Sequence, residues 1–190
     1  MINELCKLGN KTIAIIGDLI PQMDDSDLKN IADAKVIYFF GTKTSCLKCE
    51  EKIIQNSTYS QPKIIEFTSG NCINDHYAWQ VIKCKIKNTL PAFDLIIYKG
   101  RHLLEIDGLL IPLIKDMLAQ QGIVIFSDVE WSIKTSPTLN PQKNKETKKK
   151  YTDEQIALKP LKELLKMYIG NDLLEVKCKG TPYNRAYLKL

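Results

Sequence analysis

The sequence predicts an α/β fold: a mostly parallel, twisted sheet with helices on both faces, followed by a C-terminal β-hairpin. Short apolar segments rich in β-branched residues alternate with helix-like stretches, the order typical of parallel sheets. Apolar residues are nearly continuous within these segments, as expected of strands that are covered on both sides. The chain has 190 residues, and one domain usually takes roughly 100–150. We therefore expect a single domain over residues 1–190.

Five segments are predicted as parallel strands because each is short, apolar and rich in isoleucine, valine or phenylalanine. They cover residues 12–16, 35–40, 63–67, 93–98 and 122–126. Helices are expected between them, over residues 26–34, 43–55, 75–87 and 102–120. The last has the clearest helical period, because its apolar residues recur every three or four positions. They are Leu103, Ile106, Leu110, Leu113, Ile114 and Met117.

The chain changes character after the fifth predicted strand. A polar, proline-containing and lysine-rich stretch predicts a mobile loop at about 133–151, because such a composition buries too little apolar area to offset the entropy of ordering it. Thr152 and Gln155 have the spacing of a capping box, which indicates that helix restarts there. Pro160 favours the start of a further helix, which is expected to end at Tyr168.

A closing hairpin is predicted at the C-terminus. Residues 173–179 and 185–190 are strand-like, and the sequence Gly-Thr-Pro-Tyr-Asn between them is typical of a turn. No internal repeat is evident. The elements therefore follow the order of five strand and helix units and then a hairpin.

Composition and charge exclude several classes of protein. Apolar residues make up 44% and charged residues 26% of the chain, ordinary values for a globular domain. The net charge of +5 arises locally, since five lysines fall within residues 143–150, so a basic face for nucleic acid is not expected. No apolar run has the length of a membrane span, and the N-terminus lacks the pattern of a signal peptide. A cytoplasmic protein is expected.

The cysteines do not predict a metal site or a disulfide framework. Six are present, and Cys46 and Cys49 form the sole close pair, whereas a four-cysteine zinc site needs a second pair. Without a secretory signal, free thiols are the expected state. No metal is therefore predicted.

A resemblance to a known family rests mainly on residues 93–102, which read FDLIIYKGRH. This segment resembles the fourth strand of small-molecule O-methyltransferases and the cephalosporin-hydroxylase-like group, where the pattern is F-D-L, two hydrophobic residues, then I-D-G-D-H. Residues 123–129 resemble the fifth strand of that family, 63–71 its third and 13–17 its first. The family is the class I, S-adenosylmethionine-dependent methyltransferases, with a Rossmann-like fold.

The resemblance implies S-adenosylmethionine as cofactor, contacted by Gly17, Gly41 and Asn71. In the family, a glycine-rich turn after the first strand lets the backbone approach the cofactor, whereas here no second glycine follows Gly17 closely. The second strand of the family ends in an acid that binds the ribose, and Phe40 or Gly41 stands there in this chain. Asn71 occupies the place of an aspartate that contacts the adenine.

The resemblance also implies catalytic roles for His102 and Asp128, both at the carboxyl ends of neighbouring strands. Such a pair would orient a substrate hydroxyl or accept its proton. Lys99 and Arg101 replace two aspartates of the family and reverse the charge of a site that binds a divalent metal in relatives. A metal-dependent hydroxylase is therefore disfavoured.

Two functions stay open from the sequence. The first is methyl transfer from S-adenosylmethionine to an oxygen of a small molecule or sugar. The alternative is a catalytically degenerate methyltransferase-like domain that acts as a binding or scaffold module, because a fold does not fix a function. A third hypothesis, nucleic-acid binding through the lysines of residues 143–150, is disfavoured because such a run is usually a solvated loop.

Overall fold

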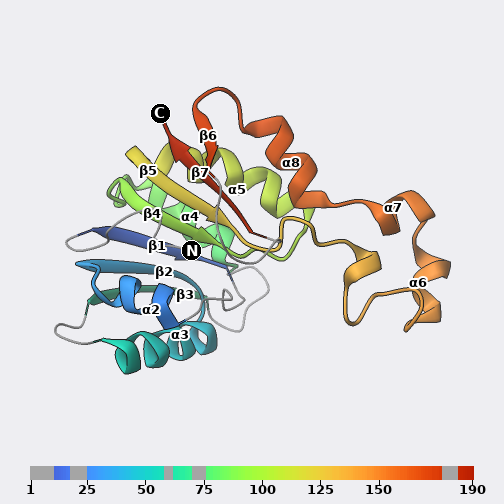
Figure 1. Cartoon of the computed structure of the whole chain (residues 1–190), viewed down its shortest axis with the longest axis horizontal. Helices are drawn as coiled ribbons and strands as arrows, with labels where there is room; N and C mark the ends of the chain where they lie inside the picture. Colours follow the sequence, from blue (N-terminus) through green and yellow to red (C-terminus); the bar gives the residue numbers. More distant parts are fainter. Residues whose placement is uncertain (1–10, 18–24, 58–61, 70–75, 177–183) are drawn as a thin grey trace.

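The computed structural model describes residues 11–17, 25–57, 62–69, 76–176 and 184–190. One seven-stranded sheet organises them (Figure 1), in the strand order β3-β2-β1-β4-β5-β7-β6. The strands are β1 (Thr12–Ile16), β2 (Val36–Thr42), β3 (Lys63–Ser69), β4 (Phe93–Tyr98), β5 (Leu118–Phe126), β6 (Leu173–Val176) and β7 (Arg185–Lys189). The first five are parallel, whereas β7 is antiparallel to both β5 and β6. The predicted fold class is confirmed.

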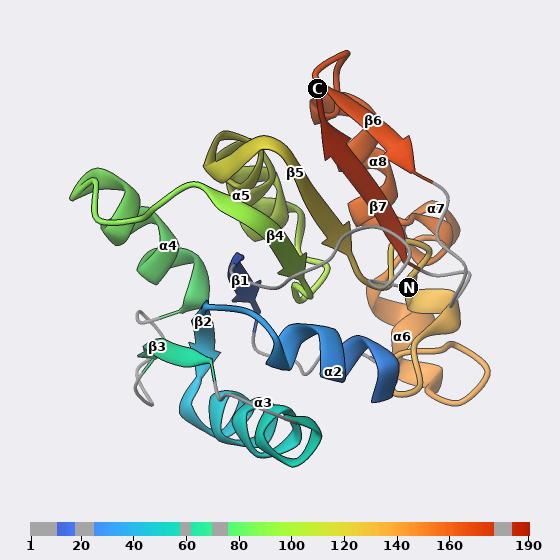
Figure 2. The ribbon, with the colours of Figure 1, turned by 60° about the vertical axis from the view of Figure 1, so that its left-hand side comes forward.

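Helices cover both faces of the sheet, as the continuous apolar strands require. Figures 1 and 2 show α2 and α3 together on one face and α4, α5 and α8 on the other. These helices are α2 (Asp25–Ala32), α3 (Lys43–Asn56), α4 (Tyr77–Ile86), α5 (Leu104–Met117) and α8 (Pro160–Tyr168). Alternate residues of one strand therefore enter different cores. Ile15 packs with α2 and α3, for example, and Ile16 with α4, α5 and α8.

The boundary between α5 and β5 differs from the prediction. The helix was expected to continue to residue 120, but it ends at Met117, because Leu118 has an extended backbone and pairs with Phe93 of β4. The ladder is irregular after this pair, and Gln121 has a positive φ of 58°. The polar residues before Gly122 thus form the irregular first part of a strand.

The segment predicted as a mobile loop at about 133–151 contains short helices, and its mobility stays a prediction. A 3-10 helix, η1, covers Ile133–Thr135, and α6 covers Lys145–Lys150. The Asn144 side chain accepts a hydrogen bond from the backbone of Glu146 and so caps α6. The next helix, α7 (Asp153–Ala157), has the predicted capping box. Figure 1 shows α6 and α7 projecting beyond the sheet.

The structure also bears on the membrane helices, cysteines and metal sites considered from the sequence. Within the described ranges, no helix is long and apolar enough to cross a membrane. Cys46 and Cys49 are buried free thiols, and burial raises their pKa to about 12 and about 11, respectively, so both stay protonated at neutral pH. No group of three or more potential metal-binding side chains occurs among the described residues.

Candidate functional site

The ends of the central strands form the floor of the candidate site. The strand ladder continues one residue past β1, β4 and β5, through three backbone hydrogen bonds. Gly17 N–H donates to Phe40 C=O at 2.8 Å, Lys99 N–H to Ile16 C=O at 2.9 Å, and Ser127 N–H to Tyr98 C=O at 2.9 Å. The residues that follow these strands therefore lie side by side at one edge of the sheet, where open α/β sheets bind ligands.

Gly17 and Gly41 lie against each other at this edge. Gly17 has a φ of +137°, which only glycine adopts readily, and a Cβ there would overlap the carbonyl oxygen of Lys99. A Cβ on Gly41 would overlap the carbonyl oxygen of Gly17. The close packing of the strand ends thus accounts for both glycines, and it leaves the floor without side chains at these two positions.

The end of β2 carries no acid. Phe40 is fully buried, and its ring stacks on Phe67 with the centroids 4.8 Å apart. The next residue is Gly41, and the Thr42 hydroxyl then accepts a hydrogen bond from Ser45 N–H at 3.2 Å as the N-cap of α3. Helix α3 begins directly after β2, at Lys43. The predicted loss of the ribose-binding acid agrees with this geometry.

Lys99 and Asp128 form an ion pair across the ends of β4 and β5. Lys99 Nζ lies 3.0 Å from Asp128 Oδ2, with the lysine side chain 9% exposed. The backbone N–H of Asp128 donates to Asn184 Oδ1 at 3.2 Å, which fastens this residue to the start of β7. The Asp128 carboxylate is therefore neutralised by a buried cation.

His102 is buried beside this ion pair. Its ring stacks on Trp131, with centroids 4.9 Å apart and planes 11° from parallel. Its Nδ1 atom is buried and has no hydrogen-bond partner among the described residues. Burial lowers the pKa of His102 to about 4; the charge of Asp128 acts to raise it and that of Lys99 to lower it. The imidazole is thus neutral at physiological pH.

Both predicted catalytic residues have left-handed backbone conformations. The φ angle is +59° at His102 and +57° at Asp128. Non-glycine residues in this region cost of order 1–3 kcal/mol, and they cluster at functional sites where the surrounding structure enforces them. The charge of Asp128 acts on the pKa of His102. His102 and Asp128 follow the ends of the neighbouring strands β4 and β5, and Asp128 is paired with Lys99, a partner that the sequence did not predict.

A second buried polar group lies next to the site. The Tyr98 hydroxyl donates a hydrogen bond to Asp107 Oδ1, and Asp107 is fully buried with Oδ2 unpartnered in the described part of the chain. Gly100 lies directly over this pair, since a Cβ there would overlap both oxygens. Burial raises the pKa of Asp107 to about 6, although the Tyr98 hydrogen bond acts to lower it. The neighbouring Arg101 N–H donates to the Tyr77 hydroxyl at 3.2 Å.

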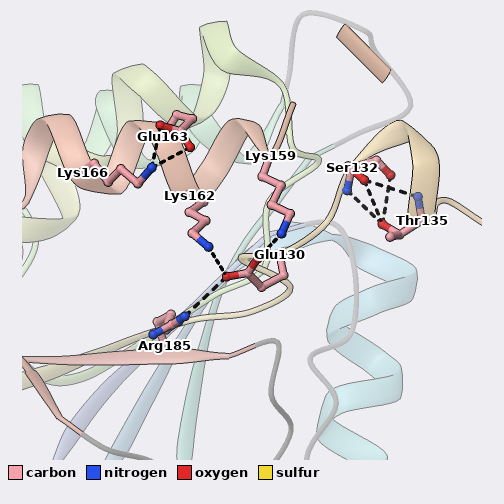
Figure 3. A network of polar contacts seen from close by, with 8 residues as sticks. All are labelled: Glu130, Ser132, Thr135, Lys159, Lys162, Glu163, Lys166 and Arg185. Atoms are coloured by element: carbon pink, nitrogen blue, oxygen red, sulfur yellow. Dashed lines mark hydrogen bonds and ion pairs between the residues drawn. The ribbon is translucent and has the colours of Figure 1, made fainter. Parts of the chain in front are cut away.

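Glu130 anchors the site to the C-terminal elements α8 and β7. Glu130 carries ion pairs to Lys159 at 2.5 Å, Lys162 at 2.7 Å and Arg185 at 3.4 Å, as Figure 3 shows. These hydrogen-bonded cations lower the pKa of Glu130 to about 2. Sequence reasoning missed this cluster, because Glu130 is 29 to 55 residues from its three partners. Of the five site residues expected from the sequence, Asn71 lies outside the described residues.

Comparison with known proteins identifies the fold. No known family model matches the chain, and no curated protein sequence is significantly similar to it. Solved structures do match. The N-methyltransferase NodS of Bradyrhizobium japonicum WM9 with S-adenosyl-L-homocysteine has a TM-score of 0.52 at 13% identity, covering 95% of this chain and 79% of NodS. The chain has the class I methyltransferase fold.

Two further structures with this class I methyltransferase fold are similar to the chain. The O-methyltransferase from Bacillus cereus has a TM-score of 0.50 at 11% identity, covering 94% of this chain and 74% of the enzyme. A methyltransferase homologue from Pyrococcus horikoshii has a TM-score of 0.51 at 13% identity, covering 98% of this chain and 64% of that protein. Because N- and O-methyltransferases both match, the similarity does not select an acceptor atom.

Proposed function

We propose that this chain is an S-adenosylmethionine-dependent methyltransferase that acts on a hydroxyl of a small molecule or sugar. The observation that carries the proposal is His102: a neutral imidazole in a strained backbone conformation at the strand ends, whose Nδ1 atom has no hydrogen-bond partner among the described residues. Backbone strain at the ends of parallel strands is typical of functional sites. The class I methyltransferase fold is consistent with it.

The glycines at the ends of β1 and β2 suit a bound cofactor, whereas the acid that would bind its ribose is missing. Gly17 and Gly41 keep side chains away from the ends of β1 and β2, which leaves backbone groups to approach a bound cofactor. However, Phe40 is buried and Thr42 caps α3, so no carboxylate is available there for the ribose hydroxyls. We therefore assign Gly17 and Gly41 to cofactor contact and expect binding weaker than in methyltransferases that have the acid.

His102 would act on the acceptor. The bound cofactor supplies a methyl group on a positively charged sulfur. A neutral imidazole accepts a hydrogen bond from the attacking hydroxyl and so orients its oxygen. A pKa of about 4 makes the ring a weak base, which favours this orienting role over removal of the proton before methyl transfer; the proton would leave the strongly acidic methylated oxygen through the imidazole to solvent. Asp128 would support His102 through its negative charge and its position. It would not bind the acceptor itself, since its carboxylate is already paired with Lys99.

The second candidate is a degenerate domain that binds a ligand without methyl transfer. The observation that favours it is the end of β2, where Phe40, Gly41 and Thr42 all serve packing or capping. In this case, the strand ends beside His102 and Trp131 would hold a ligand, and no turnover would follow.

Isothermal titration calorimetry with S-adenosylmethionine and S-adenosylhomocysteine tests the proposal. We expect specific binding with a dissociation constant weaker than low micromolar, and methylation of a hydroxyl compound in an acceptor screen at saturating cofactor. Binding that is low micromolar or tighter would contradict the interpretation of the β2 end. No binding of either compound at millimolar concentration would exclude the methyltransferase and favour the degenerate domain.

A further inference from the structure

A four-residue turn connects the site to the rest of the molecule. Asp128–Trp131 is closed by a hydrogen bond from Trp131 N–H to Asp128 C=O at 2.9 Å. Its two outer residues build the site, since Asp128 pairs with Lys99 and Trp131 stacks on His102. Its two central residues are Val129 and Glu130. The outer residues can therefore keep their places only if the central ones are held.

The two central residues are anchored by different interactions. Val129 is 2% exposed and packs in the core beneath α8. Glu130 has an 18% exposed side chain, and Figure 3 shows it between the first turn of α8 and the start of β7. Its partners Lys159 and Lys162 belong to the start of α8, and Arg185 is the first residue of β7. One carboxylate thus joins three segments that are distant in sequence.

The number and shielding of these contacts distinguish Glu130 from an ordinary surface acid. An isolated exposed ion pair contributes about 0–1 kcal/mol, because solvent screens it and two side chains lose freedom. Here one partly buried carboxylate is shared by three cations, and removing it would leave Lys159 and Lys162 without this partner, whereas Arg185 would keep its ion pair with Glu175. Glu163 offers the contrast on the same helix, since Lys166 is its one ion-pair partner within the described ranges and its side chain is 45% exposed.

We propose that Glu130 is a positioning residue, which holds Trp131 against His102 and Asp128 against Lys99 by fastening their turn to α8 and β7. Its consequence for turnover rests on the proposed function. The coupling itself does not, because it concerns the geometry of the turn. The Asn184 contact to Asp128 supports the proposal, since it fastens the same turn to the residue beside Arg185.

Tryptophan fluorescence provides a readout that requires neither cofactor nor activity. The chain has two tryptophans, and Trp79, which is 49% exposed on α4, is removed by Trp79→Phe. In this background, acrylamide quenching reports how well Trp131 is covered. We expect Glu130→Gln and Glu130→Ala to raise the quenching constant about twofold or more, at a temperature where circular dichroism shows every variant folded. Glu130→Asp should lie between these variants and the parent.

Glu163→Gln is the matched control, because it removes an acid of α8 whose ion pair with Lys166 is exposed. Its quenching constant should equal that of the parent. The proposal is overturned if Glu130→Gln and Glu130→Ala leave Trp131 as well covered as before, even if both lower the melting temperature. It is also overturned if Glu163→Gln exposes Trp131 equally. A protein that fails to bind S-adenosylmethionine would refute the proposed function and leave this test unaffected.

Discussion

Lys99 Nζ and Asp128 Oδ2 lie 3.0 Å apart, so residues that directly follow two neighbouring strands are joined by a shielded ion pair. Removing one partner of such a pair leaves an uncompensated buried charge, which is costly. The ion pair also makes the two predicted catalytic residues, Asp128 and His102, different from each other. Asp128 is paired with Lys99, whereas His102 is neutral and its Nδ1 atom has no hydrogen-bond partner in the part of the chain that the structure describes. This difference is the basis for proposing the histidine, not the aspartate, as the acceptor for a substrate hydroxyl.

The end of β2 offers one position for an acid. Phe40 is buried in the core, and a side chain on Gly41 would overlap Gly17, but Thr42 lies at the strand end as the N-cap of α3. Aspartate caps helices as well as threonine does. We therefore expect Thr42→Asp to keep the fold and to tighten S-adenosylmethionine binding about tenfold, since a hydrogen bond to a charged group contributes about 1.5–3 kcal/mol. Calorimetry measures the change.

Thr42→Asn is the control for this gain, because asparagine is also a good N-cap but carries no charge. Its affinity should stay near that of the parent. Equal affinities for Thr42→Asp and Thr42→Asn would show that the ribose does not lie at the end of β2.

Replacing His102 should affect turnover more than folding. His102→Ala is expected to lower the rate of methyl transfer by roughly 10²-fold, the low end of the range for a lost acid–base group, because the ring is a weak base. His102→Asn should have a similar effect on turnover and a smaller one on stability, since asparagine tolerates the φ of +59° better than alanine does. Single-turnover kinetics and thermal melts separate the two effects. An unchanged rate in both variants would remove His102 from the mechanism.

Acid should destabilise the protein through His102. Its pKa falls from 6.5 to about 4 on folding, so the unfolded chain binds more protons between these values. Stability from this residue is complete above about pH 6.5 and is lost as the pH falls towards 4, by on the order of 3 kcal/mol. His102→Asn should lose less stability than the parent between pH 7 and pH 4.5, as measured by urea unfolding. Parallel losses in the two proteins would show that the folded pKa of His102 is not depressed.

Asp107 should have the opposite effect on the pH dependence of stability: it should destabilise the folded protein as the pH rises. Burial raises its pKa from 3.8 to about 6, so the folded state binds more protons between these values. Stability from Asp107 is complete below about pH 4 and is lost as the pH rises through 6, by on the order of 3 kcal/mol. Asp107→Asn keeps an acceptor for Tyr98 and should gain stability relative to the parent from pH 4 to pH 7 in urea unfolding.

Tyr98→Phe provides an independent check on this window. It removes the hydrogen bond that acts to lower the pKa of Asp107, so the loss of stability should move to higher pH. If the urea-unfolding curves of the parent and Tyr98→Phe depend on pH in the same way, Asp107 does not titrate in the assigned range.

The strands were predictable because each is defined by its own residues. The runs at 12–16 and 93–98, for example, are short, mostly apolar and contain isoleucine pairs, and the structure has strands at the same positions. The start of β5 was not predictable in this way. Leu118, Ala119 and the two glutamines continue a helical pattern, and pairing with Phe93 overrides it. The helix α6 likewise depends on a cap at Asn144 and the burial of Thr147.

The candidate site was predictable only where a motif carried it. His102 and Asp128 follow recognisable strands, so the topology alone brings them to one edge. Lys99 was noted for its charge, but its pairing with Asp128 depends on the register of β4 and β5. Asp107 lies within a helical pattern, and nothing in that pattern distinguishes it from a solvated acid. Its contact with Tyr98 appears only once the helix is placed over the strand.

The ion pair between Glu130 and Lys159 also closes the base of the segment between them, which contains η1, α6 and α7. Figure 1 shows this segment projecting from the body, and its two ends meet at one carboxylate. Lengthening a loop with fixed ends costs little, about 0.6 kcal/mol for each doubling of a flexible loop. The segment between Glu130 and Lys159 is thus a natural insertion point. A protein engineer could exchange it for another sequence while the ion pair at its base and the sheet stay in place.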